Sequence, residues 1–126
     1  MSKQYINGQL MFDTDYSTSE VKTGATWING KPLYRKVVSI TTQSSAGGAF
    51  TNITDVFNAE NAHVVGGWIK GSDGYNHSIN STWSTSSLFT FTDVKDDATV
   101  VYMTVNQSNL LSRNAYIIIE YTKTTD

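Results

Sequence analysis

The chain has 126 residues, a net charge of -2 and no cysteine. This length supports one domain with a single core and excludes a multi-domain enzyme. The charge balance provides no basic surface for phosphates, so we expect no nucleic-acid partner, and the lack of cysteine excludes disulfides and zinc-thiolate sites. No apolar run has the length of a signal peptide or a membrane span, so we expect synthesis in a cytoplasm without membrane insertion.

The composition predicts an all-β fold. Seven Tyr, five Phe and three Trp accompany abundant Thr, Ser and Asn, and these residue types suit pleated sheets and the turns between them. Helix-forming residues never gather into a long segment with apolar side chains at helical spacing. We therefore expect a single antiparallel β-sandwich, jelly-roll-like, with at most one short helical turn.

The first 19 residues form a segment of their own. Large apolar side chains surround Asn7-Gly8, and a polar run follows them. This segment is either a short hairpin or an arm that packs on a neighbouring subunit, and the sequence favours neither. We place the sandwich domain at residues 20–126.

A tight turn at Asn29-Gly30 separates two predicted strands, Val21–Ile28 and Leu33–Thr42. The Asn-Gly pair tolerates the positive φ of such a turn, and Pro32 favours extended geometry in the residue before it. Large side chains on both sides of the turn supply bulk for a sheet to bury: Trp27, Ile28, Leu33, Tyr34, Val37, Val38 and Ile40.

Three segments carry a family resemblance: Tyr16–Glu20, Thr26–Lys36 and Ala115–Asp126. Together they resemble the C-terminal domain found on tail, baseplate and head-fibre proteins of bacteriophages. The resemblance spans residues 16–126, and Asn29 stands where many relatives have Asp. It implies a virion fibre tip or adhesin-like β domain, usually a homotrimer, that can contact a host-surface glycan.

The resemblance also implies what the protein does not do. It brings no catalytic residues, no metal and no cofactor, so we expect a protein that binds and is not an enzyme. Its partners would be two further copies of itself and other virion proteins, with a host-surface glycan as a candidate ligand. Its location would be the virion after synthesis in the host cytoplasm. Two alternatives stay open: a purely structural tip that drives trimer assembly, and, more remotely, a small carbohydrate-processing enzyme.

The middle of the chain contains turn signals and one helical candidate. Residues 43–48 have the composition of a loop, and residues 52–62 offer at most one helical turn. The apolar run 64–69 predicts a strand that Gly66-Gly67 interrupts, which permits a bulge or a close approach of another backbone. Asp73-Gly74 is a hairpin signal.

Three alternating strands are predicted in the last third of the chain. In residues 88–94, Phe89 and Phe91 share one face and the threonines between and after them share the other. Residues 99–106 and 113–123 alternate in the same way, with Asp96-Asp97 as a turn before the second strand. The first of these two strands places Val101, Met103 and Val105 on one face, and the second places Ala115, Ile117, Ile119 and Tyr121 on one face.

The last predicted strand has bulk on both faces, which indicates a central position or a subunit contact. Tyr116 and Ile118 lie on the opposite face of this strand from Ala115, Ile117, Ile119 and Tyr121. We expect Ile117 or Ile118 to lie at or near a contact between subunits.

One segment combines aromatic rings with polar groups among loop-forming residues, between Lys70 and Ser87. Sugars are held by an aromatic face against the apolar side of the ring, with carboxylate, amide or imidazole groups on the hydroxyls. Two of the aromatic residues, Trp68 and Trp83, can equally be core residues of flanking strands. The candidate ligand-binding residues are Trp68, Asp73, Tyr75, Asn76, His77 and Trp83.

No catalytic or metal-binding pattern accompanies this segment. His63 and His77 lack a second ligand at metal-binding spacing, and the acidic pairs Asp13/Asp15 and Asp96/Asp97 have the character of turn residues. We therefore predict no catalytic residues and no metal.

Overall fold

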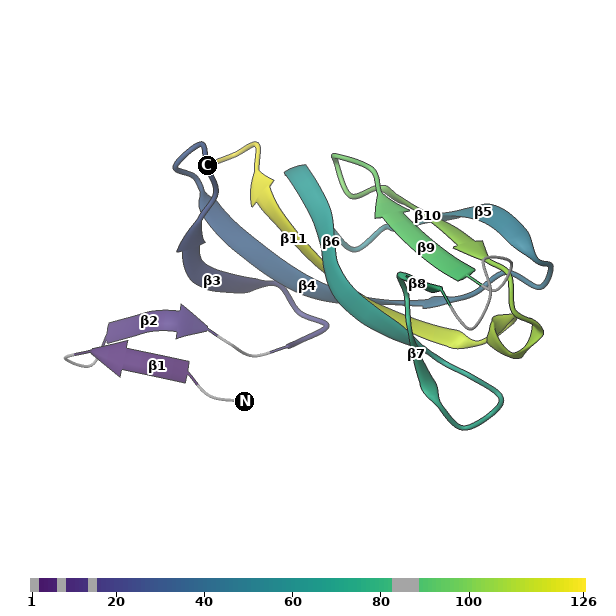
Figure 1. The fold of residues 1–126 in the computed structure, drawn as a ribbon. Helices are drawn as coiled ribbons and strands as arrows, with labels where there is room; N and C mark the ends of the chain where they lie inside the picture. The colour runs from purple at the N-terminus through teal and green to yellow at the C-terminus, as the bar shows by residue number, and fades with distance from the viewer. Residues whose placement is uncertain (1–2, 7–8, 14–15, 83–88) are drawn as a thin grey trace.

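The structure is a computed structural model that describes residues 3–6, 9–13, 16–82 and 89–126. These residues form antiparallel β-strands and one three-residue 3-10 helix, which confirms the prediction of an all-β sandwich. Figure 1 shows two sheets with a separate hairpin at the N-terminus. The five-stranded sheet contains, in spatial order, β3 (Val21–Thr26), β4 (Pro32–Thr41), β11 (Asn114–Lys123), β6 (Ala59–Lys70) and β7 (Asn76–Ser78). The four-stranded sheet contains β5 (Gly47–Asn52), β10 (Val100–Val105), β9 (Phe89–Val94) and β8 (Ser81–Thr82).

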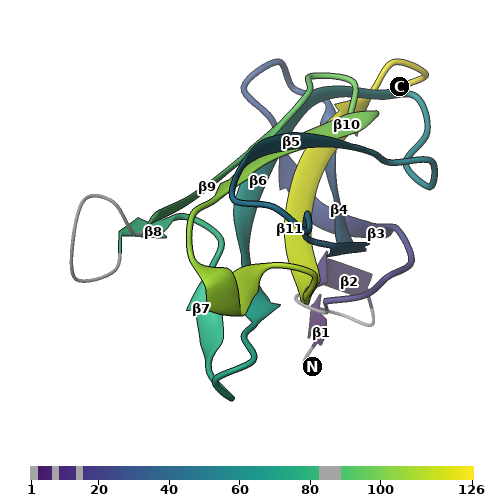
Figure 2. The same cartoon turned by 90° about the vertical axis from the view of Figure 1, so that its right-hand side faces the viewer.

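Strand β11 occupies a central position in the five-stranded sheet, as its sequence predicts. It pairs with β4 on one side and β6 on the other. Its inner side chains alternate with outer ones and are all fully buried, because they face the second sheet (Figure 2). The buried members are Ala115, Ile117, Ile119 and Tyr121.

Strand β10 supplies the opposing layer of the core. Val101, Met103 and Val105 are buried, and they belong to the same apolar cluster as the inner side chains of β11. Alternation predicts that these three side chains share a face, and the structure shows that this face is the buried one. Residues outside the strands close the ends of the core: Ile53, Val56, Ile79, Ala98 and Leu110.

Strand β9 turns its threonines inward and a phenylalanine outward. Thr90 and Thr92 are buried opposite Val105 and Met103 of β10, whereas Phe91 is 52% exposed. The hydroxyl of Thr92 donates to the carbonyl of Ile79 at 2.9 Å, so this inward polar atom is satisfied. An aromatic side chain is therefore available on the outer face of the four-stranded sheet.

The Gly66-Gly67 pair lies at a β-bulge and at a close approach of a neighbouring backbone, the two features that the sequence allows. The register between β6 and β11 shifts so that Val65 is an extra residue, which is a β-bulge. Gly67 has a φ of 143°, and a Cβ at this position would lie 2.2 Å from the carbonyl oxygen of Tyr116. The neighbouring backbone occupies the space that a side chain needs.

The middle of the chain differs in detail from the sequence pattern. Residues 52–62, where the sequence allowed at most one helical turn, contain no helix: Ile53 and Val56 close the end of the core from an irregular loop, and β6 already begins at Ala59. The three-residue spacing of Ile53 and Val56 therefore belongs to a loop and not to a helix. The described residues place the helical turn at η1 (Ser108–Leu110) instead, and they contain two strands that the sequence did not predict, β5 and the two-residue β8.

The turn before β4 forms as predicted, but its apolar neighbour is not buried. Gly30 has a φ of 81°, and its N–H donates to the carbonyl of Trp27 at 2.9 Å. Ile28 lies at the tip of this turn with 93% of its surface exposed, so it adds nothing to the core. The hydrogen bonds that close the turn, from Trp27 N–H to the carbonyl of Lys31 and from Gly30 N–H to the carbonyl of Trp27, hold Ile28 away from the sheet.

The N-terminal segment contains a hairpin, one of its two predicted forms. Strand β1 (Lys3–Ile6) pairs antiparallel with β2 (Gln9–Asp13), and Figure 1 shows this hairpin beside β3 and outside the two sheets. The chain joins the sandwich soon afterwards, because the N–H of Val37 donates to the carbonyl of Ser17 at 2.8 Å.

Gly30 and Gly67 form a matched pair for a stability test. Gly30→Val should lower the free energy of unfolding by about 1 to 3 kcal/mol through backbone strain, since open space surrounds the added side chain. Gly67→Val should cost more, because it adds a collision with the backbone of Tyr116. Denaturant titrations of both variants measure the two losses. A Gly67→Val loss no larger than that of Gly30→Val would contradict the close approach of the strands.

Candidate functional site

The ligand-binding residues predicted from sequence cluster around the β6–β7 hairpin but divide between its two faces. Trp68 pairs with Ser78, and Lys70 pairs with Asn76, so Trp68 and Asn76 share one face of the sheet. His77 is the partner of Ile69 and lies on the opposite face. The structure therefore does not collect these side chains on one surface.

Asp73 and His77 are engaged in holding the hairpin together. The Nε2 atom of His77 lies 2.9 Å from Oδ2 of Asp73, and the side-chain amide of Asn109 donates to the same oxygen at 2.8 Å. The backbone N–H of Tyr75 donates to the other carboxylate oxygen at 3.1 Å. These bonds tie the β6–β7 turn to the 3-10 helix η1, and they leave little of the carboxylate for a ligand.

This network explains the electrostatics of the turn. The pKa of Asp73 is lowered from its ordinary value, chiefly by the hydrogen bond from the N–H of Tyr75 and further by His77 and Asn109. His77 itself is buried. Asp73 is thus a turn-capping carboxylate that stays ionised in the folded protein.

The aromatic residues of the same region also lie apart. Tyr75 is 68% exposed, and its ring meets the ring of His77 edge-on at 6.5 Å. Trp68 packs on Tyr116 of β11, with ring centroids 5.4 Å apart. Trp83 lies outside the described residues. Trp68 is therefore neither the core residue nor the loop platform that the sequence suggested, but part of an aromatic pair on the outer sheet surface.

The two isoleucines expected near a subunit contact have different environments. Ile117 is fully buried in the core of its own chain. Ile118 is half-buried on the outer face of the five-stranded sheet, next to Tyr116 on the same strand. Of the two, Ile118 is the one that another subunit can reach.

A second aromatic surface lies on the outer face of the four-stranded sheet. Phe50 of β5, Tyr102 of β10 and Phe91 of β9 form this surface, which we call the aromatic face. Phe50 is 77% exposed, and its ring lies 4.7 Å from the ring of Tyr102 at an angle of 51°. These rings come from three neighbouring strands of one sheet, so the backbone hydrogen bonds between the strands fix the spacing of the rings.

The position of Tyr102 depends on a glycine in the neighbouring strand. A Cβ on Gly48 would lie 1.9 Å from the hydroxyl oxygen of Tyr102 and 2.6 Å from the ring carbon that carries it. The ring therefore lies across β5 in the space that the absent side chain leaves. A tyrosine packed over a cross-strand glycine is held as a flat, partly exposed platform.

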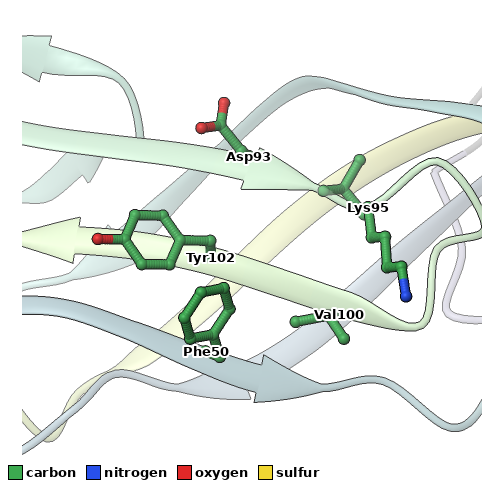
Figure 3. A pocket seen from close by; sticks show the side chains of 6 residues that line it. Phe50, Asp93, Lys95, Val100 and Tyr102 are labelled. Carbon is green, nitrogen blue, oxygen red and sulfur yellow. The ribbon is translucent and has the colours of Figure 1, made fainter.

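A hollow of about 420 Å³ adjoins these rings, and Figure 3 shows its lining. Phe50, Tyr102 and Val100 form an apolar floor, and Asp93 and Lys95 stand at its border on the β9 side. Asp93 is the register partner of Tyr102, so its carboxylate stands beside the aromatic ring. The hollow thus combines a ring surface with a polar edge.

Asp93 is chemically available. Its carboxylate forms no ion pair or hydrogen bond with any other residue that the structure describes, whereas Lys95 lies 3.9 Å from Asp97. A carboxylate without a protein partner can accept hydrogen bonds from a ligand. In this respect Asp93 differs from Asp73, whose oxygens are occupied.

Sequence reasoning missed the aromatic face for a definable reason. Alternation shows that Phe89 and Phe91 share a face, but it does not show which face of the strand is buried. Strand β5, which contributes Phe50, was not predicted. The signal that could have found it is the pairing of Phe91 with β10. Its partner on that strand, Thr104, lies on the face opposite Val101 and Met103, which belong to the core.

The two histidines and the acidic residues that the structure describes form no candidate metal site. The described residues contain no group of three or more His, Cys, Asp or Glu that could hold a metal ion. His63 packs against Trp27 at 4.9 Å, and its Nδ1 lies 2.9 Å from the carbonyl of Asn61. Nor do the described residues include a helix with the length and apolar character needed to cross a membrane.

Comparisons of the chain with models of protein families, with curated proteins and with solved structures found no match. The function of the domain must therefore be inferred from the chemistry of its surface.

The lowered pKa of Asp73 predicts an acid-sensitive hairpin. Because the folded-state pKa lies below the ordinary 3.8, the stabilisation is present above that value and is lost as the pH falls through the folded pKa. Asp73→Asn should therefore lose less stability than the wild type between about pH 5 and pH 2. Denaturant titrations across this range measure the difference. Equal losses in the two proteins would show that the Asp73 network does not stabilise the fold.

Proposed function

We propose that this chain is a domain of a bacteriophage fibre or related tail structural protein, and that it attaches as a homotrimer to a glycan on the host surface. The resemblance of the segments 16–20, 26–36 and 115–126 supports the assignment to a virion. The observation that carries the binding function is the aromatic face, where a tilted pair of rings and a carboxylate with no partner among the described residues border one hollow.

Saccharide recognition uses this combination of groups. The C–H side of a pyranose ring packs on an aromatic ring, and the hydroxyls at its edge donate to a carboxylate. Tyr102 and Phe50 provide the rings, and Asp93 provides the acceptor beside them. The site proposed from sequence at residues 70–83 lacks this arrangement, because Asp73 and His77 bond to each other.

A trimer would strengthen such a site. One stacked ring contributes about 1 kcal/mol, so a single site is weak, and three copies on one fibre tip raise the avidity on a repetitive surface. Ile118, Trp68 and Tyr116 form a partly exposed apolar strip on the outer face of the five-stranded sheet. This strip lies on the sheet that does not carry the aromatic face, so the subunits can meet there and leave the aromatic faces open.

Binding without catalysis fits the surface best. A glycosidase needs two carboxylates across one cleft, and the hollow beside the aromatic face has Asp93 as its one acidic lining residue. A purely structural tip would form the trimer and bind no glycan, which separates that alternative from ours by measurement.

Tyr102→Ala should abolish detectable binding on a glycan array and strongly reduce adsorption to host cells. Gly48→Val keeps the tyrosine but displaces its ring, so it should weaken binding as well. Tyr75→Ala, which removes an exposed ring at the β6–β7 turn, is the matched control and should bind like the wild type. Loss of binding in Tyr75→Ala with normal binding in Tyr102→Ala would place the site at the hairpin, as the sequence suggested.

Light scattering at micromolar concentration should show three times the 13.9 kDa mass of the chain. Ile118→Lys should dissociate or unfold the assembly, because it introduces an unpaired charge into an apolar contact. Ser45→Lys, in the exposed loop between β4 and β5, is the control and should leave the mass unchanged. A wild-type monomer would contradict the trimer, and an unchanged Ile118→Lys trimer would place the contact elsewhere.

A further inference from the structure

A second hollow lies on the other side of Asp93, between β6 and β9. Its volume is about 510 Å³, and it shares Asp93 and Val94 with the hollow beside the aromatic face. The backbone bond from Ala62 N–H to the carbonyl of Asp96, at 3.0 Å, joins the two sheets near one end. The remaining lining residues are Ala62, His63, Val64, Asn80 and Thr92.

Asn80 presents a fixed donor to this hollow. Its side-chain oxygen accepts the backbone N–H of Thr92 at 2.7 Å, which determines the orientation of the amide. The NH₂ group of this amide forms no hydrogen bond with another residue in the part of the chain that the structure describes. It can therefore donate to a ligand without any rearrangement of the protein.

The edge of β9 adds backbone groups. The N–H of Thr92 points away from β10, toward Asn80, and N–H groups two residues apart along a strand point to the same side. The N–H and carbonyl of Val94 therefore face the second hollow. In the described chain β8 pairs with β9 at Phe89 and Thr90, so it does not cover this side of Val94.

We propose that the two hollows are adjacent subsites for one neutral oligosaccharide of at least two sugar residues. This inference rests on the proposed glycan-binding function. Phe50, Tyr102 and Asp93 are register partners on three successive strands, and at about 4.8 Å between strands this row spans about 10 Å before the second hollow begins. A single pyranose that stacks on the rings leaves the second hollow empty.

The chemistry of each subsite differs. The first sugar packs on Tyr102 and Phe50, and the second donates to and accepts from the polar groups around Asn80 and Val94. Asp93 stands between them and accepts a hydroxyl from either sugar. The oligosaccharide is neutral, because a sugar carboxylate at this position would meet the unpaired charge of Asp93.

The test compares sugars of different length on matched variants. Isothermal calorimetry is run with the glycan that the array identifies, with the methyl glycoside of each of its sugars, and with a sialylated form of the same glycan. Asn80→Asp retains the acceptor for the N–H of Thr92 and removes the NH₂ donor. Asn114→Asp adds the same charge at an exposed position at the start of β11 and is the control.

The oligosaccharide should bind the wild type at least about tenfold more tightly than any methyl glycoside, and Asn80→Asp should reduce this ratio about three- to tenfold, the effect of one lost hydrogen bond. The sialylated form should bind more weakly than the neutral one, and Asn114→Asp should behave as the wild type.

Equal affinities for one sugar and for the oligosaccharide, or an unchanged ratio in Asn80→Asp, would overturn the second subsite. If Tyr102→Ala still abolishes binding in that case, the proposed glycan-binding function stands with a single subsite. Absence of binding to every glycan on the array would overturn both proposals.

Discussion

The packing of β11 against β10 is the contact on which the rest of the structure depends. The chain has no cysteine, so apolar burial must hold the two sheets together. Ile117 and Ile119 are fully buried and belong to one cluster with Val101 and Met103 of the other sheet. Each buried aliphatic side chain of this kind stabilises the fold by about 1.5 to 3 kcal/mol. Because β11 also pairs with β4 and β6, it joins the core to both halves of its own sheet.

The same contact positions the proposed binding surface. Tyr102 lies between two core residues of β10, and Asp93 follows the buried Thr92 on β9. A displacement of the backbone at either residue would therefore require movement of the core. A site built on strands in this way is pre-organised, so little conformational freedom is lost when a ligand binds. Gly48 of β5, the register partner of Thr104, completes this arrangement by leaving room for the ring of Tyr102.

The β6–β7 turn and the outer face of the four-stranded sheet both place aromatic rings near an acidic group, and their hydrogen bonds distinguish them. At the β6–β7 turn, Asp73 accepts bonds from the backbone of Tyr75 and from Asn109, and it contacts His77. These groups stabilise the turn itself. On the four-stranded sheet, the carboxylate of Asp93 has no such partner among the described residues. Composition alone makes the first region look like the better site, because it cannot show whether a polar group is already satisfied.

The sequence by itself determined the strand class, which side chains of β10 and β11 share a face, the turns at Gly30 and Asp73-Gly74, and the irregularity at Gly66-Gly67. These features are local, since a period of two and a positive φ are properties of a few consecutive residues. Tertiary structure decided that the threonines of β9 face inward, that the loop within residues 52–62 closes one end of the core, and that the ring of Phe50 packs against the ring of Tyr102. Alternation shows which side chains share a face, but which face is buried depends on the strand that pairs with it and on the sheet that packs above. The aromatic face exists because β5, β10 and β9, distant in sequence, lie side by side.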